Sequence, residues 1–309
     1  MKRILITEPM HLPAVDHLRA RHEVLYEPTL VDEPKRLLDA AANVDALIVR
    51  NRTQVRGELL GALGRCRVVG RLGVGLDNLD MAGCEARGIV VIPATGANAA
   101  GVAEYVIASA MLLLRRVFDS TGAVAAGQWP RAALARSHEI AGKTMGLVGF
   151  GDIGRHTAVL ARALGMRVLA WQGRRSANDP LYSQAGVAAL PLPELLASAD
   201  VVSVSLPLTD ETRGLLGPAQ IAAMKPAAVL VNTARGGIVD EAALVAALRG
   251  GALAGAALDV FDVEPLPPSP QFEGVPNLWL TPHVAGSSVE SIERVGWMVA
   301  RGVEQALTL

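Results

Sequence analysis

Short apolar runs alternate with stretches of helical length along almost the whole chain. Runs that are apolar at nearly every position are typical of strands in a parallel sheet that is covered on both faces. Their alternation with helices predicts an α/β fold with crossover connections. One series of expected strands occupies residues 3–7, 23–26, 45–49, 67–69 and 89–92. A second series begins at Met145 and continues at residues 167–171, 200–204, 228–232, 253–258 and 278–280.

The second series opens with a glycine motif. An apolar strand leads into Gly149-x-Gly151-x-x-Gly154, and residues 152–164 have a helical pattern. In a dinucleotide-binding turn the first glycine permits the tight turn, the second lets a pyrophosphate approach the backbone, and the third lets the helix pack on the strand. The N-terminus of the helix offers N–H groups to the phosphates. A purely structural turn is the alternative, but the strand–turn–helix context favours nucleotide binding.

The position that usually contacts the cofactor ribose follows the strand at residues 167–171. Here the chain has the neutral Gln172, then Gly173, Arg174 and Arg175. An acidic residue would accept hydrogen bonds from the ribose hydroxyls and repel a 2′-phosphate, whereas a guanidinium forms charge-assisted hydrogen bonds with phosphate. We therefore predict that NADP(H) is preferred and that NAD(H) is possible. The alternative is that both arginines are solvated loop residues.

The two series predict two doubly wound parallel-sheet domains, of which only the second has a glycine motif. A long apolar helix at residues 98–117 and an irregular arm at residues 123–141 separate the two series. A final helix at residues 287–307 is expected to return to the first domain, with a ligand cleft between the domains. The expected division is a Rossmann-type domain at residues 98–284, inserted into a flavodoxin-like substrate domain at residues 1–97 and 285–309.

Composition narrows the function classes. The chain has 309 residues, enough for two cores, and its formal net charge of −1 leaves no basic field for nucleic acid. The two cysteines, Cys66 and Cys84, form no metal-ligand cluster and are expected to be reduced and buried. Charges interrupt every apolar run before it reaches membrane-spanning length, and the N-terminus has no signal-peptide pattern. We expect a cytoplasmic protein with no membrane or metal partner.

Three groups of reactive side chains follow strands of the second series. Arg235 follows one strand, the acids Asp259, Asp262 and Glu264 follow the next, and His283 follows the last. The carboxyl ends of the strands are where α/β sheets bind ligands. Taken singly, each group is better explained as a surface charge or a structural residue. Their shared placement beside a nucleotide motif predicts an active site.

These motifs, in this order, resemble the D-isomer-specific 2-hydroxyacid dehydrogenase family, which includes phosphoglycerate dehydrogenases and glyoxylate/hydroxypyruvate reductases. The resemblance extends over nearly the whole chain. Besides the glycine motif, the segments that carry it are residues 71–80, 98–104, 200–209, 232–237, 257–261, 264–265 and 282–283.

The resemblance implies three catalytic residues. His283 would give a proton to the substrate carbonyl oxygen as hydride arrives from the nicotinamide, and an imidazole suits this because it titrates near neutrality. Glu264 would hydrogen-bond the other imidazole nitrogen and favour the protonated form through its opposite charge. Arg235 would bind the substrate carboxylate and polarise the adjacent carbonyl.

The resemblance also implies the remaining contacts with the ligands. The backbone around Val74 and Gly75 would bind the substrate carboxylate, and Arg50 would contact the distal end of the substrate. Asp259 would accept a hydrogen bond from the nicotinamide carboxamide, with capping of a turn as the alternative. The expected cofactor contacts are Gly149, Gly151, Asp152, Ile153, Gly154, Gln172, Arg174, Arg175, Leu206, Pro207, Thr212, Thr233, Ala234, Arg235, Asp259, His283 and Gly286.

We therefore expect an oxidoreductase that uses NADP(H) to reduce a small 2-ketoacid such as glyoxylate or hydroxypyruvate. An NAD-linked dehydrogenase of D-3-phosphoglycerate or another D-2-hydroxyacid is the enzymatic alternative. A nucleotide-sensing corepressor with the same fold is the alternative from another class. Formate dehydrogenase is disfavoured, because the partner of its histidine is a glutamine rather than an acid. A homodimer is expected from the apolar run at residues 108–114, for which intrachain core is the alternative.

Overall fold

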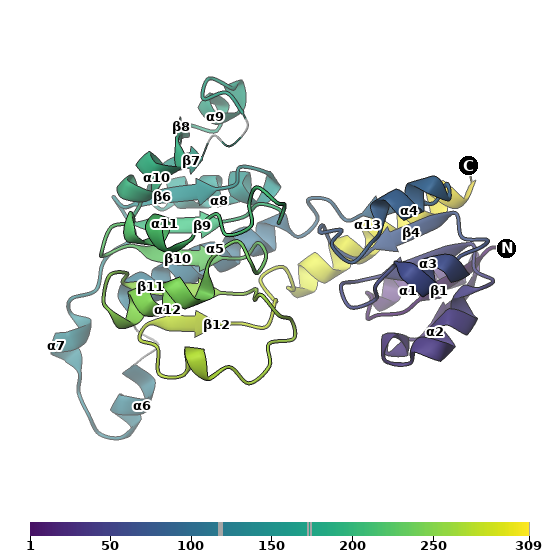
Figure 1. Cartoon of the computed structure of the whole chain (residues 1–309), viewed down its shortest axis with the longest axis horizontal. Helices are drawn as coiled ribbons and strands as arrows, with labels where there is room; N and C mark the ends of the chain where they lie inside the picture. Colours follow the sequence, from purple (N-terminus) through teal and green to yellow (C-terminus); the bar gives the residue numbers. More distant parts are fainter. Residues whose placement is uncertain (117–119, 172, 174, 309) are drawn as a thin grey trace. The chain divides into compact units, whose positions relative to one another are not determined.

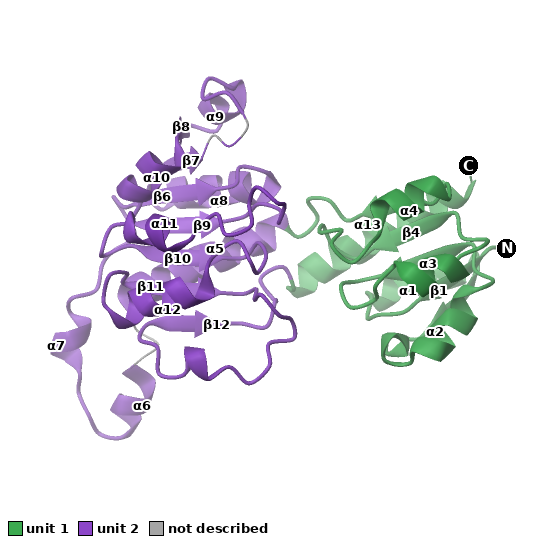
Figure 2. Ribbon diagram, in the orientation of Figure 1, with its two compact units in different colours: residues 1–98, 287–309 green, residues 99–286 purple. Residues whose placement is uncertain are grey.

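The computed structural model describes residues 1–309 except 117–119, 172, 174 and 309. The chain divides into two compact units, the first made of residues 1–98 and 287–309 and the second of residues 99–286 (Figure 2). Each unit is built around one wholly parallel sheet with helices packed on it (Figure 1). The predicted α/β class with two parallel-sheet domains is thus confirmed.

Unit 1 contains a five-stranded sheet in the order β2-β1-β3-β4-β5. Side chains alternate across it, as the pleat requires: Ile4 and Ile6 pack on one face with α1 and α13, and Leu5 packs on the other face. The strands are β1 (Arg3–Ile6), β2 (Glu23–Tyr26), β3 (Ala46–Val49), β4 (Val68–Arg71) and β5 (Val90–Pro93). The helices are α1 (Leu12–Arg19), α2 (Pro34–Ala41), α3 (Gly57–Ala62), α4 (Met81–Ala86) and α13 (Val289–Thr308), with a 3₁₀ turn, η1, at Leu30–Asp32.

Unit 2 contains a seven-stranded sheet in the order β12-β11-β10-β9-β6-β7-β8. The strands are β6 (Thr144–Val148), β7 (Arg167–Trp171), β8 (Ala188–Leu190), β9 (Val201–Val204), β10 (Val229–Asn232), β11 (Gly255–Leu258) and β12 (Leu278–Leu280). The helices that pack on the sheet are α5 (Ala99–Arg115), α8 (Asp152–Ala163), α9 (Pro180–Gln184), α10 (Leu192–Ser198), α11 (Pro218–Ala222) and α12 (Glu241–Arg249), and a 3₁₀ turn, η3, lies at Pro270–Phe272. Of these strands, β8 was not predicted.

The segment after α5 stands away from the sheet of unit 2 (Figure 1). It contains two short helices, α6 (Ser120–Ala125) and α7 (Arg131–Leu134), neither of which has a buried residue. Trp129 between them is 78% exposed. The prediction of an irregular arm is therefore partly wrong, since short pieces of helix form within it.

The two thiols lie in the core of unit 1. Cys66 and Cys84 are buried and form no disulfide, as predicted. Burial raises the pKa of Cys66 to about 11 and also raises the pKa of Cys84, so both stay protonated. In the described part of the chain, no cluster of His, Cys, Asp and Glu can hold a metal ion. None of the helices described there is long and apolar enough to span a bilayer.

Candidate active site

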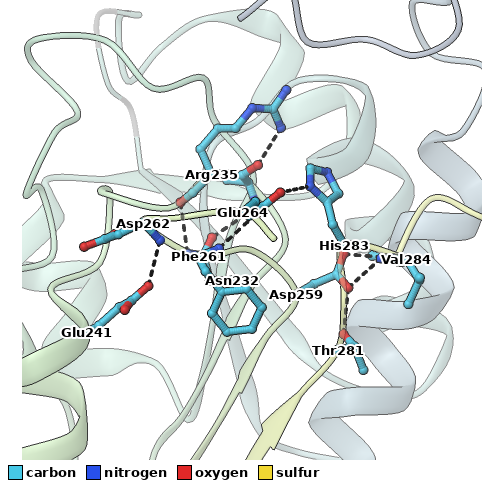
Figure 3. Close-up of polar contacts among 12 residues, drawn as sticks. Asn232, Arg235, Glu241, Asp259, Phe261, Asp262, Glu264, Thr281, His283 and Val284 are labelled. Carbon is cyan, nitrogen blue, oxygen red and sulfur yellow. Dashed lines mark hydrogen bonds and ion pairs between the residues drawn. The ribbon is translucent and has the colours of Figure 1, made fainter. Parts of the chain in front are cut away.

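The reactive side chains of unit 2 gather where three adjacent strands end. Arg235 follows β10, Asp259 follows β11 and His283 follows β12, and these strands are neighbours in the sheet. Because parallel strands end at the same edge, residues far apart in sequence meet there. Figure 3 shows Arg235, Glu264, His283 and Asp259 within this one group of side chains.

One short polar contact in the group joins an imidazole and a carboxylate. Nδ1 of His283 lies 2.7 Å from Oε2 of Glu264, and Oε1 of Glu264 accepts the N–H of Phe261 at 3.0 Å. An ionised carboxylate has no hydrogen to donate, so Nδ1 must carry the hydrogen of this contact. Nε2 is then the ring nitrogen that can exchange a proton with a ligand.

The carboxyl group of Glu264 is held in its ionised form. Burial acts to raise its pKa, but the hydrogen bond and positive charge of His283, the N–H of Phe261 and the positive charge of Arg235 together outweigh burial. The net result is a pKa of Glu264 below its ordinary value. Glu264 is therefore an acceptor rather than a proton donor at neutral pH.

The turn that carries His283 has an unusual backbone conformation. His283 has φ of +55°, in the left-handed region that non-glycine residues seldom adopt. Its N–H donates to the carbonyl oxygens of Asp259 at 2.8 Å and Thr281 at 3.0 Å. Such a conformation persists only where surrounding contacts over-determine it.

The buried carboxylate of Asp259 supplies those contacts. Asp259 is 1% exposed; its Oδ1 accepts the Thr281 hydroxyl at 2.6 Å and the N–H of Val284 at 2.8 Å, and its Oδ2 accepts the N–H of Ala285 at 2.8 Å. The residues on both sides of His283 are thus fixed to one carboxylate (Figure 3). The expected contact of Asp259 with a nicotinamide carboxamide stays a prediction, and the contacts seen here are those of its alternative role, the capping of a turn.

A hydroxyl from α5 extends the brace. Tyr105 Oη lies 2.6 Å from Thr281 Oγ1. Since Thr281 donates its one hydroxyl hydrogen to Asp259, Tyr105 must be the donor in its contact with Thr281. Burial raises the pKa of Tyr105, and the negative charge of Asp259 adds to this, so the phenol stays protonated.

Arg235 reaches the group because a glycine follows it. A Cβ at Gly236 would lie 1.9 Å from the carbonyl oxygen of Phe261, so only glycine allows the two loops to approach this closely. Nη1 of Arg235 donates to the carbonyl oxygen of Ala234 at 2.6 Å, which directs the guanidinium. The positive charge of Arg235 helps to lower the pKa of Glu264.

The glycine motif has the geometry expected of a nucleotide-binding turn. Gly149 has φ of +116°, and a Cβ there would lie 2.5 Å from the carbonyl oxygen of Ser205. A Cβ at Gly154, in α8, would lie 2.4 Å from the carbonyl oxygen of Gly149, so the third glycine permits the close packing. A Cβ at Gly151 would meet nothing within 4 Å. The fold itself therefore gives no steric reason for that glycine, and the predicted approach of a phosphate to it stays a prediction. Asp152 and Ile153 form the first turn of α8, where backbone N–H groups lack partners within the helix.

The other expected cofactor residues of unit 2 lie in loops at the carboxyl ends of the strands. Thr233 and Ala234, after β10, are both buried. Thr212 Oγ1 donates to the carbonyl oxygen of Pro207 at 2.7 Å and so shapes the loop that also contains Leu206. Gly286, the last residue of unit 2, is half-buried.

The predicted determinants of NADP(H) preference are only partly visible. Gln172 and Arg174 lie outside the described residues. Arg175 is exposed, and its Nη1 lies 3.4 Å from Oδ2 of Asp179. This long surface ion pair fits a solvated loop residue as well as it fits a phosphate ligand.

The expected substrate residues of unit 1 lie after its strands. Arg50 follows β3 and is half-buried. Val74 and Gly75 follow β4, where Val74 is 40% exposed and Gly75 is half-buried. Sequence reasoning missed Glu8, a buried acid after β1 that accepts backbone N–H groups near Arg50. Its one signal was a carboxylate at the end of an apolar strand.

Fold and site together define a dinucleotide-dependent oxidoreductase of the two-domain α/β type, and comparison with known proteins gives the family. Residues 107–285 match the family described as D-isomer specific 2-hydroxyacid dehydrogenase, NAD binding domain. Over 307 residues the chain is 48% identical to a protein named (S)-sulfolactate dehydrogenase from Chromohalobacter salexigens, covering 99% of each. This chain therefore belongs to the D-isomer-specific 2-hydroxyacid dehydrogenase family, as the sequence motifs predicted.

Two further relatives widen the comparison. A D-3-phosphoglycerate dehydrogenase from Archaeoglobus fulgidus is 37% identical over 306 residues, covering 97% of this chain and 56% of that protein. The chain thus spans about half the length of that dehydrogenase. The solved structure of a glyoxylate reductase from Paecilomyes thermophila superposes with a TM-score of 0.86 at 29% identity, covering 99% of this chain and 95% of the other. The family's nucleotide-binding domain makes a nicotinamide dinucleotide the cofactor class.

Proposed function

We propose that the chain interconverts a small 2-ketoacid and its D-2-hydroxyacid and prefers NADP(H), with His283, Glu264 and Arg235 as its catalytic residues. The observation that carries the proposal is the 2.7 Å contact between Nδ1 of His283 and Oε2 of Glu264 beside Arg235. That contact leaves one imidazole nitrogen for substrate and fixes the ring through the other.

Each residue has a distinct part in the reduction of the ketoacid. A bound reduced nicotinamide supplies the hydride that C2 of the substrate receives. His283 donates the Nε2 proton to the carbonyl oxygen, and Glu264 holds the ring in orientation through Nδ1. Arg235 binds the substrate carboxylate with its planar pair of N–H groups and offsets the negative charge that develops on the carbonyl oxygen. In the oxidation of the alcohol, the same imidazole accepts the hydroxyl proton.

The chain's own residues fit the dinucleotide. Open space at Gly151 and the N-terminus of α8 suit a pyrophosphate, with Asp152 and Ile153 as backbone donors. The absence of an acid at Gln172, with Arg174 and Arg175 after it, supports a 2′-phosphate.

Two substrates compete for the role of ketoacid. Glyoxylate or hydroxypyruvate is the first candidate, which the sequence motifs predicted and which the similarity to a glyoxylate reductase supports. The second is 3-sulfopyruvate, the ketoacid of sulfolactate, because a relative of that name is 48% identical over 99% of both chains. A half-buried arginine after β3, Arg50, would suit the distal sulfonate of the latter.

The stereochemical labels of the family and of the second candidate agree. Sulfur outranks oxygen when R and S are assigned, so the sulfomethyl group of sulfolactate takes precedence over its carboxylate. In lactate the carboxylate takes precedence over the methyl group. The arrangement called R in D-lactate is therefore called S in sulfolactate. A D-isomer-specific site accordingly accepts (S)-sulfolactate.

Steady-state assays with glyoxylate, hydroxypyruvate, 3-sulfopyruvate and 3-phosphohydroxypyruvate, each with NADPH and with NADH, test the proposal. We expect turnover with at least one of the first three substrates and a higher kcat/KM with NADPH. A clear preference for NADH contradicts the role given to Arg174, and preference for the phosphorylated ketoacid favours the phosphoglycerate alternative. No turnover with any substrate contradicts the enzyme and favours a nucleotide-sensing corepressor.

A single substitution sharpens the cofactor assignment. Gln172→Asp places a carboxylate where it would repel a 2′-phosphate, so the ratio of kcat/KM with NADPH to that with NADH should fall. Gln305→Asp adds the same charge at an exposed position of α13 in unit 1 and is the matched control. An unchanged ratio in Gln172→Asp contradicts the assignment.

A cytoplasmic homodimer completes the proposal. Much of the apolar run at residues 108–114 is core of unit 2 itself, since Ser109, Ala110, Leu113 and Leu114 are buried. The support for a dimer comes instead from α6 and α7, which have no buried residue, and from Trp129, which is 78% exposed. Light scattering at micromolar concentration should give twice the mass of the chain, and the mass of a single chain contradicts the dimer.

A further inference from the structure

The loop after β3 in unit 1 is folded around a buried carboxylate. Glu8, at the end of β1, is 2% exposed. Its Oε1 accepts the N–H of Arg50 at 2.8 Å and of Thr53 at 2.9 Å, and its Oε2 accepts the N–H of Arg52 at 3.1 Å. Three of the backbone donors of residues 50–53 therefore point at one side chain. A carboxylate can accept this number of donors, whereas an amide cannot.

A second set of contacts fixes the same loop from its carbonyl side. Asn78 Nδ2 donates to the carbonyl oxygens of Arg50 at 3.2 Å and Thr53 at 2.7 Å. The hydroxyls of Thr7 and Thr53, both buried, lie 2.9 Å apart. The backbone of residues 50–53 is thus held by the side chains of Glu8 and Asn78, and Thr7 holds the side chain of Thr53. These contacts restrict the conformations that the loop can adopt.

The two guanidinium groups of the loop have different partners. Arg52 pairs with Asp32, which offsets its charge within the chain. Arg50 instead donates from Nη2 to the neutral Ser287 Oγ at 3.1 Å, and no carboxylate in the described part of the chain forms an ion pair with it. Arg50 therefore presents a positive charge that no carboxylate among the described residues pairs with.

We propose that Glu8 is a positioning residue, whose buried carboxylate shapes the loop at residues 50–53 and so fixes Arg50 for the distal anionic group of the substrate. This inference rests on the proposed function and selects within it a 2-ketoacid with a second negative charge at C3, such as 3-sulfopyruvate. Glu8 contacts no substrate; it acts through the backbone N–H groups of the loop. A loop whose conformations are already restricted loses less entropy when the anion binds, so its shape is expressed as affinity.

The test compares substrates that differ at the distal end. Glu8→Gln keeps the size of the side chain but places an NH₂ group against one of the loop's N–H donors. We expect KM for 3-sulfopyruvate to rise about tenfold, while KM and kcat for glyoxylate, which has no distal group, change less than about twofold. Glu8→Asp keeps the charge but shortens its reach by one carbon; it should shift KM in the same direction and serves where Glu8→Gln does not fold.

Asp45 provides the matched control. It is a buried acid at the other end of β3, where it accepts the N–H of Arg3 at 2.8 Å and Nη2 of Arg65 at 3.1 Å. Asp45→Asn should lower the melting temperature as Glu8→Gln does, yet leave the ratio of kcat/KM for 3-sulfopyruvate and glyoxylate unchanged. A parallel loss with both substrates in Glu8→Gln, or no loss with either, overturns the inference.

A binding measurement separates this inference from the proposed function. Sulfoacetate has a carboxylate and a sulfonate on one carbon, and acetate lacks the sulfonate. Calorimetric titration of the full chain should show weaker binding of sulfoacetate by Glu8→Gln than by the wild type, with acetate unaffected. If sulfoacetate binding is weakened in this way but the chain reduces no 2-ketoacid, the proposed function is wrong and the positioning role of Glu8 is supported. Equal sulfoacetate affinity in the two proteins overturns the role of Glu8 even where the chain is an active reductase.

Discussion

Two loops, one in each unit, are each held by a buried carboxylate, but the basic side chains that they carry have different partners. In unit 2 the turn around His283 is fastened to Asp259 by the N–H groups of Val284 and Ala285. In unit 1 the loop at residues 50–53 is fastened to Glu8 by three N–H groups. Both carboxylates are nearly inaccessible, at 1% and 2% exposure. Each carboxylate accepts hydrogen bonds from backbone N–H groups rather than pairing with a cation. It thereby fixes a short loop at the carboxyl end of a parallel strand.

The difference lies in what the fixed loop offers. Asp259 secures a histidine whose imidazole contacts the carboxylate of Glu264. Glu8 secures an arginine whose side chain contacts the neutral Ser287, so its charge is left for a ligand. In both loops the buried carboxylate fixes the backbone. The partner of the side chain that the loop carries, Glu264 or Ser287, determines whether that side chain faces a negative charge. Substitutions of brace and of presented residue should therefore have separable effects.

The largest effect is expected from removing the presented imidazole. His283→Ala removes the proposed acid/base, whose contribution is typically about 10²–10⁴-fold, so kcat should fall by that range. Steady-state assays with the best 2-ketoacid check this. Far-ultraviolet circular dichroism of the variant should match the wild type. Retention of more than about a tenth of kcat means that another group moves the proton.

Removing the brace in unit 2 should affect both stability and turnover. Asp259→Asn replaces a charged acceptor of two N–H groups and a hydroxyl, each worth about 1.5–3 kcal/mol when the acceptor is ionised, so unfolding free energy should fall by at least one such contribution. Because the turn holds His283 at φ of +55°, kcat should fall as well. Urea denaturation and steady-state kinetics measure the two effects.

Glu8→Gln is the counterpart of this change in unit 1. We expect it to lower the unfolding free energy by a similar amount, because the same kind of contact is lost. It should spare kcat for glyoxylate, which Asp259→Asn should not. Equal losses of kcat in both variants indicate that the two braces act through general stability, and the comparison between the loops then fails.

The side chains proposed to bind or react could be predicted from the sequence. The buried carboxylates that hold their loops could not be assigned that role from it. Arg235 and His283 stand directly after apolar strands, where the order of strands brings their side chains together. An acceptor of backbone N–H groups leaves no comparable pattern, since its partners are not side chains. For this reason Glu8 was missed, and capping of a turn was only the alternative to a cofactor contact for Asp259. The strand Ala188–Leu190 was missed because two of its three residues are alanine, a residue type depleted in strands.

The acid beside His283 should make stability depend on pH. The folded-state pKa of Glu264 lies below its ordinary value, so its ionised form stabilises the fold above the ordinary carboxyl pKa of about 4.3. That contribution is lost as the pH falls through the lowered folded-state pKa. Glu264→Gln does not titrate, so its deficit in unfolding free energy should be greatest near neutral pH and shrink on acidification. Denaturation at several pH values measures it, and a deficit that grows in acid contradicts the sign.

The smallest effect is expected from Tyr105, which contacts Asp259 only through the hydroxyl of Thr281. Tyr105 Oη lies 2.6 Å from the Thr281 hydroxyl, which in turn donates to Asp259. Tyr105→Phe removes only the outer hydrogen bond and leaves Thr281 with its acceptor, so unfolding free energy should fall by about 0.5–1.5 kcal/mol and kcat by less than about twofold. Thr281→Val breaks the inner contact and leaves a charged oxygen of Asp259 with one donor fewer, so its cost should be larger. An equal or greater loss in Tyr105→Phe means that the phenol, rather than the carboxylate, holds the turn, and the likeness between the two loops would no longer stand.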